Sequence, residues 1–209
     1  MTTVAAGKSR HDGRRTPVQE RARASCDAIL EATARILSSA EGRELPSTNR
    51  IAKLAGVSVG TLYQYFDSRE AILRALCRRH ADEMMMLLLA HAGPLVDASP
   101  REAVPVFIDA MAAAHAVAPR LHLALVREML ADGGELLAEV QDPGRALVLA
   151  WLTRHRDVIR PRDLPAAAFL LTHTVEAAIH GQLLDDPSRL KDTAWRSELV
   201  DLMLRYLLP

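Results

Sequence analysis

Small polar and aromatic side chains follow a glycine in the first third of the chain, in the arrangement that a DNA-reading helix needs. Gly56 falls where two short helices with apolar faces must turn, and the residues from Ser58 to Thr61 are all small. Small side chains let a helix backbone approach the floor of the major groove. The stretch from Ser47 to Arg69 is therefore interpreted as a helix-turn-helix unit.

Two side chains of this unit suit base reading. Gln64 offers a donor and an acceptor to a base edge, preferably that of adenine, and Val59 is placed to touch a thymine methyl group. Hydroxyls and cations at the edges of the unit suit phosphate contacts, which fix register without reading sequence. The predicted DNA-contacting residues are Thr48, Ser58, Val59, Gly60, Thr61, Tyr63, Gln64, Tyr65 and Arg69. For Tyr65, which falls on a buried side, core packing is an equal alternative.

The elements that position this unit are predicted to be helices, because apolar residues recur at spacings of three and four. β-Branched residues never alternate for long, so strands are not expected. The fold class is all-α, with about nine helices. Their approximate ranges are 18–40, 48–55, 59–66, 68–91, 100–117, 119–131, 144–159, 163–184 and 189–208.

Charge is distributed unevenly along the chain, although the formal net charge is zero. Residues 1–80 hold 14 Lys and Arg against 8 Asp and Glu, whereas residues 81–209 hold 12 against 18. A basic end that contains the helix-turn-helix unit would orient the molecule toward a polyanion. Residues 1–17 have the composition of a disordered basic tail, and an arm that lies along DNA phosphates is a further hypothesis.

The composition also limits where the protein works. No uncharged apolar run reaches the roughly 18 residues of a membrane span, and the N-terminus lacks the apolar core of a secretory signal. We therefore expect a cytoplasmic protein with no membrane partner. Cys26 and Cys77 show neither CxxC spacing nor a disulfide framework, so both are expected to be buried and without a redox role.

The segment Ile51–Leu73, IAKLAGVSVGTLYQYFDSREAIL, resembles the DNA-binding domain of TetR-family transcriptional regulators. The resemblance extends from about Arg21 to Leu76. Arg69 stands where lysine is commoner in the family, but a guanidinium can grip the same phosphate. After the basic tail (1–17), the predicted domains are a DNA-binding domain (18–67) and, as the resemblance implies, a helical domain for effector binding and dimerisation (68–209).

The resemblance also implies how such a protein is switched. A small apolar effector would enter the body, shift the fourth helix and change the distance between the two recognition helices of the dimer. These helices must stand about 34–36 Å apart to enter successive major grooves.

Two apolar stripes near the C-terminus suit a four-helix interface across a two-fold axis. Their residues are Leu171, Val175, Ile179, Trp195, Leu199, Leu202, Met203 and Tyr206. The alternative, that these stripes form an internal core, fits the pattern equally well.

Aromatic, histidine and methionine side chains of the body are candidates for lining an effector pocket. They are Phe107, Met111, His115, His122, Met129, Trp151, His155, Phe169 and His173. The pairs His115/His122 and His173/His180 are seven residues apart, which would place each pair on one helix face. Because no acidic or thiol partner stands at ligand spacing, neither a metal site nor a cofactor is expected.

The favoured interpretation is a homodimeric, ligand-responsive repressor that binds a palindromic operator in double-stranded DNA and is released by a small apolar effector. A helical small-molecule enzyme is an alternative, with histidines as acid–base groups. Against it, the sequence contains neither HExxH nor a glycine-rich phosphate loop. A further alternative is a DNA-binding protein that needs no effector.

Overall fold

The computed structural model describes residues 17–39, 45–92, 95 and 97–209, and this part of the chain contains helices and no strand. The predicted all-α class is therefore confirmed. The predicted basic tail lies outside the described residues, except for Pro17, where the first helix begins. The α-helices are α1 (Pro17–Ser38), α2 (Thr48–Ala55), α3 (Val59–Tyr65), α4 (Arg69–Ala92), α5 (Pro100–Val117), α6 (Pro119–Ala131), α7 (Glu135–Arg154), α8 (Leu164–Asp185) and α9 (Thr193–Leu207), with a 3-10 helix, η2 (Pro187–Lys191), between the last two.

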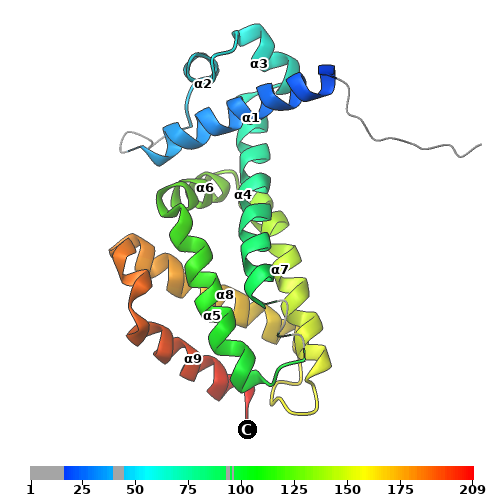
Figure 1. Ribbon diagram of the computed structural model, residues 1–209. Coiled ribbons are helices and arrows are strands. Elements are labelled where there is room, and N and C mark those ends of the chain that lie inside the picture. Colours follow the sequence, from blue (N-terminus) through cyan, green and yellow to red (C-terminus); the bar gives the residue numbers. More distant parts are fainter. Residues whose placement is uncertain (1–16, 40–44, 93–94, 96) are drawn as a thin grey trace, which may run out of the picture.

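The helices form a head and a body that share one long helix. Helices α1, α2 and α3 make the head, α5 to α9 make the body, and α4 runs from the head down into the body (Figure 1). Helix α6 lies directly below α1 and packs against it. The body therefore meets the head chiefly through α4 and α6, with Leu136 of α7 packed into the same core.

Capping side chains set where the helices begin. Ser47 caps α2 by accepting a hydrogen bond from the Arg50 N–H, and Asp163 caps α8 by accepting one from the Ala166 N–H. Each such bond satisfies a backbone donor that has no partner within its helix. Pro119 occupies the first turn of α6, where its missing N–H has no cost.

The prediction for the seventh helix was wrong at its start. Pro143 was taken as a boundary, but it lies inside α7, which begins at Glu135. The actual break is at Gly133 and Gly134, whose φ angles of 86° and 81° are accessible chiefly to glycine. Pro143 is exposed, so water can reach the backbone carbonyl that proline leaves unbonded.

The first hydrophobic core, the head core, joins the helix-turn-helix unit to the body. Ile29 of α1, Ile51 of α2 and Leu62 of α3 are fully buried in it. Leu125 and Met129 of α6 belong to the same cluster. The predicted division at residue 67 thus crosses continuous packing, and a displacement of α6 must be accommodated by the head.

The second hydrophobic core, the body core, uses residues that had been assigned to a dimer interface. Leu171, Val175, Ile179, Leu199 and Met203 are each at most 8% exposed within the single chain. Trp195 and Tyr206 are half-buried and pack against this core, while Leu202 is 53% exposed. This burial favours the internal-core alternative for these five residues, which lie on the inward faces of α8 and α9. A dimer contact by any of the eight residues stays a prediction.

A sharp bend separates α5 from α6, whose axes differ by 92°. Within the described ranges, no helix by itself has the length and apolar character of a membrane span. The bent α5–α6 pair meets those criteria of length and composition only when both helices are taken together.

Candidate functional site

The turn between α2 and α3 fixes how the head presents α3. Gly56 ends α2 with a φ of 70°, in the left-handed region, and its N–H bonds back to the carbonyls of Ala52 and Lys53. Ile51 of α2 and Leu62 of α3 are then buried together in the head core. This arrangement is a helix-turn-helix, with α3 as the second, DNA-reading helix.

The outward face of α3 carries the side chains predicted to read bases. Val59, Gly60, Tyr63 and Gln64 are all exposed. An ideal Cβ on Gly60 would have the Ser58 hydroxyl oxygen as its nearest neighbour, at 3.8 Å. The fold therefore leaves space at Gly60, and the absence of a side chain there shortens the distance at which another molecule can approach.

The two hydroxyls at the start of α3 hold the helix terminus. The Ser58 Oγ accepts a hydrogen bond from the Thr61 N–H at 2.9 Å, and it lies 2.8 Å from the Thr61 Oγ1. Both groups thus support the N-terminal turn, whose partial positive charge also favours phosphate. Their predicted contact with DNA would add to this capping role.

The predicted phosphate-binding residues occupy different environments. The Thr48 Oγ1 lies 3.3 Å from the hydroxyl of Tyr63, which links the start of α2 to the outer face of α3. Tyr65 is half-buried and packs against the head core. Arg69 is exposed and forms an ion pair with Glu70, with 2.7 Å between Nε and Oε1. The hydrogen bond from Arg69 lowers the pKa of the Glu70 carboxyl.

Two further cations beside the unit were missed by the sequence interpretation. Arg50 and Lys53 are exposed on α2, three residues apart, and so lie on one side of that helix. The sequence signal for these two cations is their spacing of three residues in α2, the first helix of the unit. Cations in such positions contribute affinity without sequence preference.

The body contains two adjoining cavities. The first, the apolar cavity, has a volume of about 190 Å³. The second, the histidine cavity, has a volume of about 300 Å³. The two share wall residues, among them Leu88 of α4, Phe107 of α5 and Val148 of α7.

Most of the predicted pocket residues line one of these cavities. Phe107 lines both and Trp151 lines the apolar cavity. Of the predicted pocket residues, those on the wall of the histidine cavity are Met111, His115, His122, Met129, Phe169 and His173. His155 lines neither; its ring Nδ1–H donates to the Trp151 carbonyl at 2.9 Å at the end of α7. Contact of any of these residues with an effector stays a prediction.

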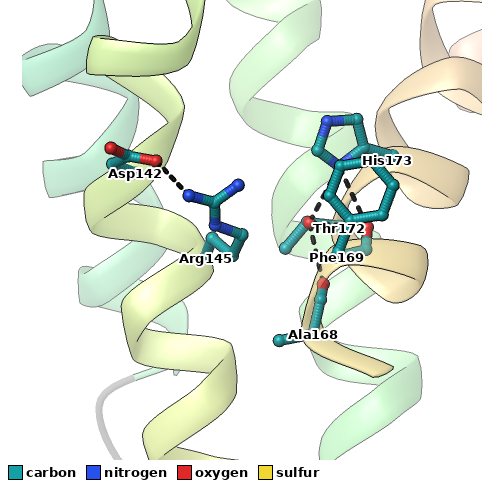
Figure 2. A network of polar contacts seen from close by, with 6 residues as sticks. All are labelled: Asp142, Arg145, Ala168, Phe169, Thr172 and His173. Carbon is teal, nitrogen blue, oxygen red and sulfur yellow. Dashed lines mark hydrogen bonds and ion pairs between the residues drawn. The ribbon is translucent and has the colours of Figure 1, made fainter. Parts of the chain in front are cut away.

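Part of the wall of the histidine cavity is formed by Arg145 of α7 and by an aromatic pair on α8, which face each other (Figure 2). Arg145 of α7 is bonded to Asp142, and in Figure 2 its side chain extends toward α8. On α8, the His173 ring stacks on Phe169 with centroids 4.0 Å apart, and its Nδ1–H donates to the Phe169 carbonyl.

At the inner end of the histidine cavity, histidines from four helices meet. His80 of α4 has its Nε2 3.1 Å from the Nδ1 of His122 on α6, and the Nε2 of His122 lies 2.8 Å from the Nε2 of His180 on α8. His115 of α5 stacks edge-on against His122, with centroids 4.4 Å apart. We call these four residues the histidine cluster.

Burial keeps the histidine cluster uncharged. Desolvation, assisted by the neighbouring rings, lowers the pKa of His115 to about 4 and that of His122 to about 2. Desolvation also lowers the pKa values of His80 and His180. Burial likewise raises the pKa of the Cys77 thiol, which lies on the same cavity wall, to about 12. Near neutral pH the cluster therefore consists of neutral imidazoles next to a protonated thiol.

Of the two histidine pairs predicted to share a helix face, His173 and His180 do lie seven residues apart on α8, but the prediction for His115 and His122 was wrong. His115 and His122 are on different helices, separated by the bend at Ala118, and so do not share a helix face. His173 stacks on Phe169 instead of joining His180. His80 and His180 join the cluster through tertiary contacts that no local spacing signals.

Comparison with known proteins agrees with this geometry. Residues 99–207 match the family described as "Tetracyclin repressor-like, C-terminal domain", and residues 29–76 match "Bacterial regulatory proteins, tetR family". An uncharacterized HTH-type transcriptional regulator of Mycobacterium tuberculosis is 34% identical over 77 residues, which are 37% of this chain and 38% of that protein. The nucleoid occlusion factor SlmA of Haemophilus ducreyi is 41% identical over 51 residues, 24% of this chain and 25% of that protein.

Solved structures share the fold over almost the whole chain. The fatty acid degradation regulator FadR from Bacillus halodurans superposes with a TM-score of 0.71 at 18% identity, covering 91% of this chain and 96% of that chain. A TetR family transcription regulator from Marinobacter aquaeolei VT8 gives a TM-score of 0.69 at 19% identity, covering 91% and 98%. At these identities the likeness concerns the fold. With both family matches in register with the head and the body, the chain belongs to the TetR family of DNA-binding transcriptional regulators, a family of non-enzymatic proteins.

Proposed function

We propose that this regulator is a homodimeric repressor that leaves a palindromic operator when a small, largely apolar effector occupies its body. The apolar cavity is the observation that carries the proposal. Its wall is built by four body helices together with Leu88 and Leu89 of α4, the helix that follows the DNA-reading unit. A molecule that fills the cavity therefore contacts the element that connects body and head.

The wall of the apolar cavity suggests the chemistry of its ligand. Aliphatic and aromatic side chains dominate it, so burial of an apolar ligand surface supplies most of the affinity. The Thr172 hydroxyl on this wall already bonds to the Ala168 carbonyl, whereas the indole Nε1–H of Trp151 is buried and has no hydrogen-bond partner among the described residues. A buried donor without a partner is costly, so a ligand that brings one acceptor to this N–H gains selectivity.

The proposed switch acts through distance. In a two-fold dimer, both α3 helices must stand about 34–36 Å apart to enter successive major grooves. A shift of α4 by a few ångströms changes that distance without altering α3 itself. Effector and DNA then stabilise different separations of the heads, which gives a coupling free energy of about 1–3 kcal/mol in typical allosteric proteins.

The proposed dimer surface is the outward face of α8 with its neighbour α9. Leu170 and Leu184 are 48% and 74% exposed on α8, and the small residues Ala177 and Gly181 lie between them on the same helix face. Leu202 of α9 is 53% exposed. Apolar side chains flanking small residues let two helices approach closely, as a four-helix interface requires.

Sedimentation of a Leu184→Asp variant tests the dimer. A buried carboxylate at the interface should yield monomers and abolish operator binding, while Leu130→Asp, at a 59% exposed leucine on α6, should stay dimeric. A dimeric Leu184→Asp variant would refute the proposed surface.

The alternative of an effector-independent DNA-binding protein is tested with an operator selected from a random duplex library. Compounds that quench Trp151 fluorescence in a Trp195→Phe background report cavity occupancy. We expect such compounds to lower operator affinity at least fivefold in the wild-type chain. If compounds that saturate the cavity leave operator affinity unchanged, the protein binds DNA independently of an effector, and the proposed effector response is wrong. The proposed place of action is the cytoplasm, where bacterial DNA lies.

A further inference from the structure

Three members of the histidine cluster bring their ring nitrogens close together, an arrangement that neither helix capping nor core packing requires. His115, His122 and His180 come from α5, α6 and α8, and one ring nitrogen of each lies within 4.8 Å of the other two. His115 and His122 are 2% and 8% exposed. Three imidazole nitrogens converging from three helices are a donor set that transition-metal ions prefer.

Hydrogen bonds to the remaining ring nitrogens orient these donors. A carbonyl can only accept, so the His115 Nδ1 must carry the proton in its 2.8 Å bond to the Met111 carbonyl, which leaves the Nε2 lone pair available. The His122 Nδ1 is directed at the Nε2 of His80, so its own Nε2 is the nitrogen that faces His180. Such outer partners fix the tautomer and the ring orientation of metal-binding histidines.

We propose that His115, His122 and His180 bind one divalent transition-metal ion, Zn²⁺ or an ion of similar preference, with His80 as the outer partner that positions His122. Tetrahedral Zn²⁺ with Zn–N bonds of about 2.0–2.1 Å holds its nitrogens about 3.3 Å apart. The His122 and His180 Nε2 atoms are 2.8 Å apart, so a side-chain shift of less than an ångström opens the required space.

The surroundings of the three nitrogens suit a bound cation. All three residues line the histidine cavity, which provides a path of entry and room for a fourth ligand such as water. Glu176 lies on the same wall, one turn before His180 on α8, and is bonded to Gln141. Burial raises the pKa of its carboxyl group, and a cation bound nearby would favour the ionised form, which offsets part of the charge of the ion. Mg²⁺ and Ca²⁺, which prefer oxygen ligands, have no comparable donor set here.

Bound metal would tie three helices, α5, α6 and α8, together near the junction of body and head, with α4 joined to them through the contact of His80 with His122. His122 is followed on α6 by Leu125 and Met129, one and two turns further on, and both are buried in the head core against α1. A metal that draws His122 toward α5 and α8 therefore acts on the packing that orients α3. This regulatory consequence rests on the proposed function, whereas the metal site does not.

The site is tested on the tag-free full-length chain after removal of metals with a chelator. Calorimetric titration with Zn²⁺ should show one ion per chain. Co²⁺ should give the visible absorption of a four-coordinate site with three nitrogen ligands, and Mg²⁺ should not bind. Single variants His115→Leu, His122→Leu and His180→Leu should each weaken Zn²⁺ binding at least tenfold, because each removes one of three ligands.

Matched variants separate ligation from folding. His155→Ala removes a histidine outside the cluster and should bind Zn²⁺ as the wild type does. His80→Ala should weaken binding about 10–100-fold, and His80→Gln, which keeps an acceptor for the His122 Nδ1–H, should recover part of that loss. Circular dichroism and thermal unfolding of each metal-free variant establish that it is folded. Unchanged Zn²⁺ affinity in folded His115→Leu and His180→Leu variants would overturn the site.

A second arm addresses regulation. Saturating Zn²⁺ should change wild-type affinity for the selected operator at least fivefold and leave the His180→Leu affinity unchanged. Zn²⁺ binding without any change in operator affinity would keep the metal site and overturn its regulatory role. Loss of operator binding in metal-free and metal-loaded chains alike would instead overturn the proposed DNA-binding function, independently of the calorimetric result.

Discussion

The Nε2 atoms of His122 and His180 lie 2.8 Å apart, across the junction of α6 and α8. At this distance one nitrogen carries the shared proton and the other accepts it, so the two rings form a neutral hydrogen-bonded pair. Protonation of either ring would place an imidazolium cation in a desolvated environment, and desolvation already lowers both pKa values. The pair is therefore stable only while it stays neutral, whether or not a metal replaces the proton.

Acid should destabilise the metal-free protein through these buried histidines. The pKa of His115 falls from 6.5 to about 4 on folding, so below about pH 6.5 the unfolded chain binds its proton first. Each such histidine then costs about 1.4 kcal/mol of unfolding free energy per pH unit, down to its folded pKa. Urea unfolding in the presence of a chelator, between about pH 6.5 and 4, measures this slope.

The variant His115→Leu isolates that contribution from the carboxyl groups that titrate in the same range. Its stability should fall less steeply with decreasing pH, by about 1.4 kcal/mol per pH unit, because one proton-binding group of the unfolded state is gone. Folded carboxyls with lowered pKa values, such as Glu70 and Glu139, destabilise both proteins equally on acidification. Identical slopes for the two proteins would contradict neutral burial of His115.

Removal of the Tyr63 hydroxyl should weaken binding to every DNA sequence alike. This hydroxyl is at the exposed edge of α3, 3.3 Å from the Thr48 Oγ1, where a phosphate contact fixes register. We expect Tyr63→Phe to lower affinity about two- to tenfold on operator and random duplexes, the worth of one hydrogen bond. Tyr65→Phe is the matched control, since Tyr65 packs against the head core and should keep its affinity. Equal losses in both variants would argue against this division of roles.

Gln64 should instead determine sequence preference. It is exposed on the outer face of α3 and is the long amide side chain in that helix. Gln64→Ala is expected to lose about 1–3 kcal/mol of discrimination at one base pair per half-site, with little change on random DNA. Selection of operators by the variant and the wild type measures this directly. A uniform loss on all sequences would assign Gln64 to the phosphate backbone.

The sequence determined the DNA-binding unit well because its signals are local. Gly56 at the turn, Ser58 at the helix start and the apolar positions of Ile51 and Leu62 each act within a few residues. Pro143 misled the prediction for α7, because a proline on an exposed helix face is tolerated when glycines nearby supply the real break. Local sequence signals thus predict helix boundaries, except where a proline and a nearby pair of glycines are both possible helix ends.

Tertiary arrangements could not be predicted in the same way. An apolar stripe such as Leu171, Val175 and Ile179 indicates burial but does not say whether the covering surface is the same chain or a partner. The histidine cluster joins residues that are 42 and 58 positions apart in sequence, so no helical spacing connects them. Both features depend on how the helices pack, which periodicity within one helix does not encode.

Gly60 offers the sharpest separation between folding and DNA binding. An added methyl group would meet only the Ser58 Oγ at 3.8 Å, so the fold accommodates it, and alanine is favoured over glycine in a helix by about 0.5–1 kcal/mol. Gly60→Ala should therefore match or exceed wild-type thermal stability.

Gly144→Ala on α7, whose Cβ would lie 3.7 Å from the Met85 Cε, is a matched helical control away from α3. If α3 lies against the floor of the major groove, only Gly60→Ala should lose operator affinity, by at least tenfold, because its methyl group holds the backbone away from the bases. Operator titrations of both variants decide this, and full affinity in Gly60→Ala would show that the first turn of α3 does not approach the bases closely.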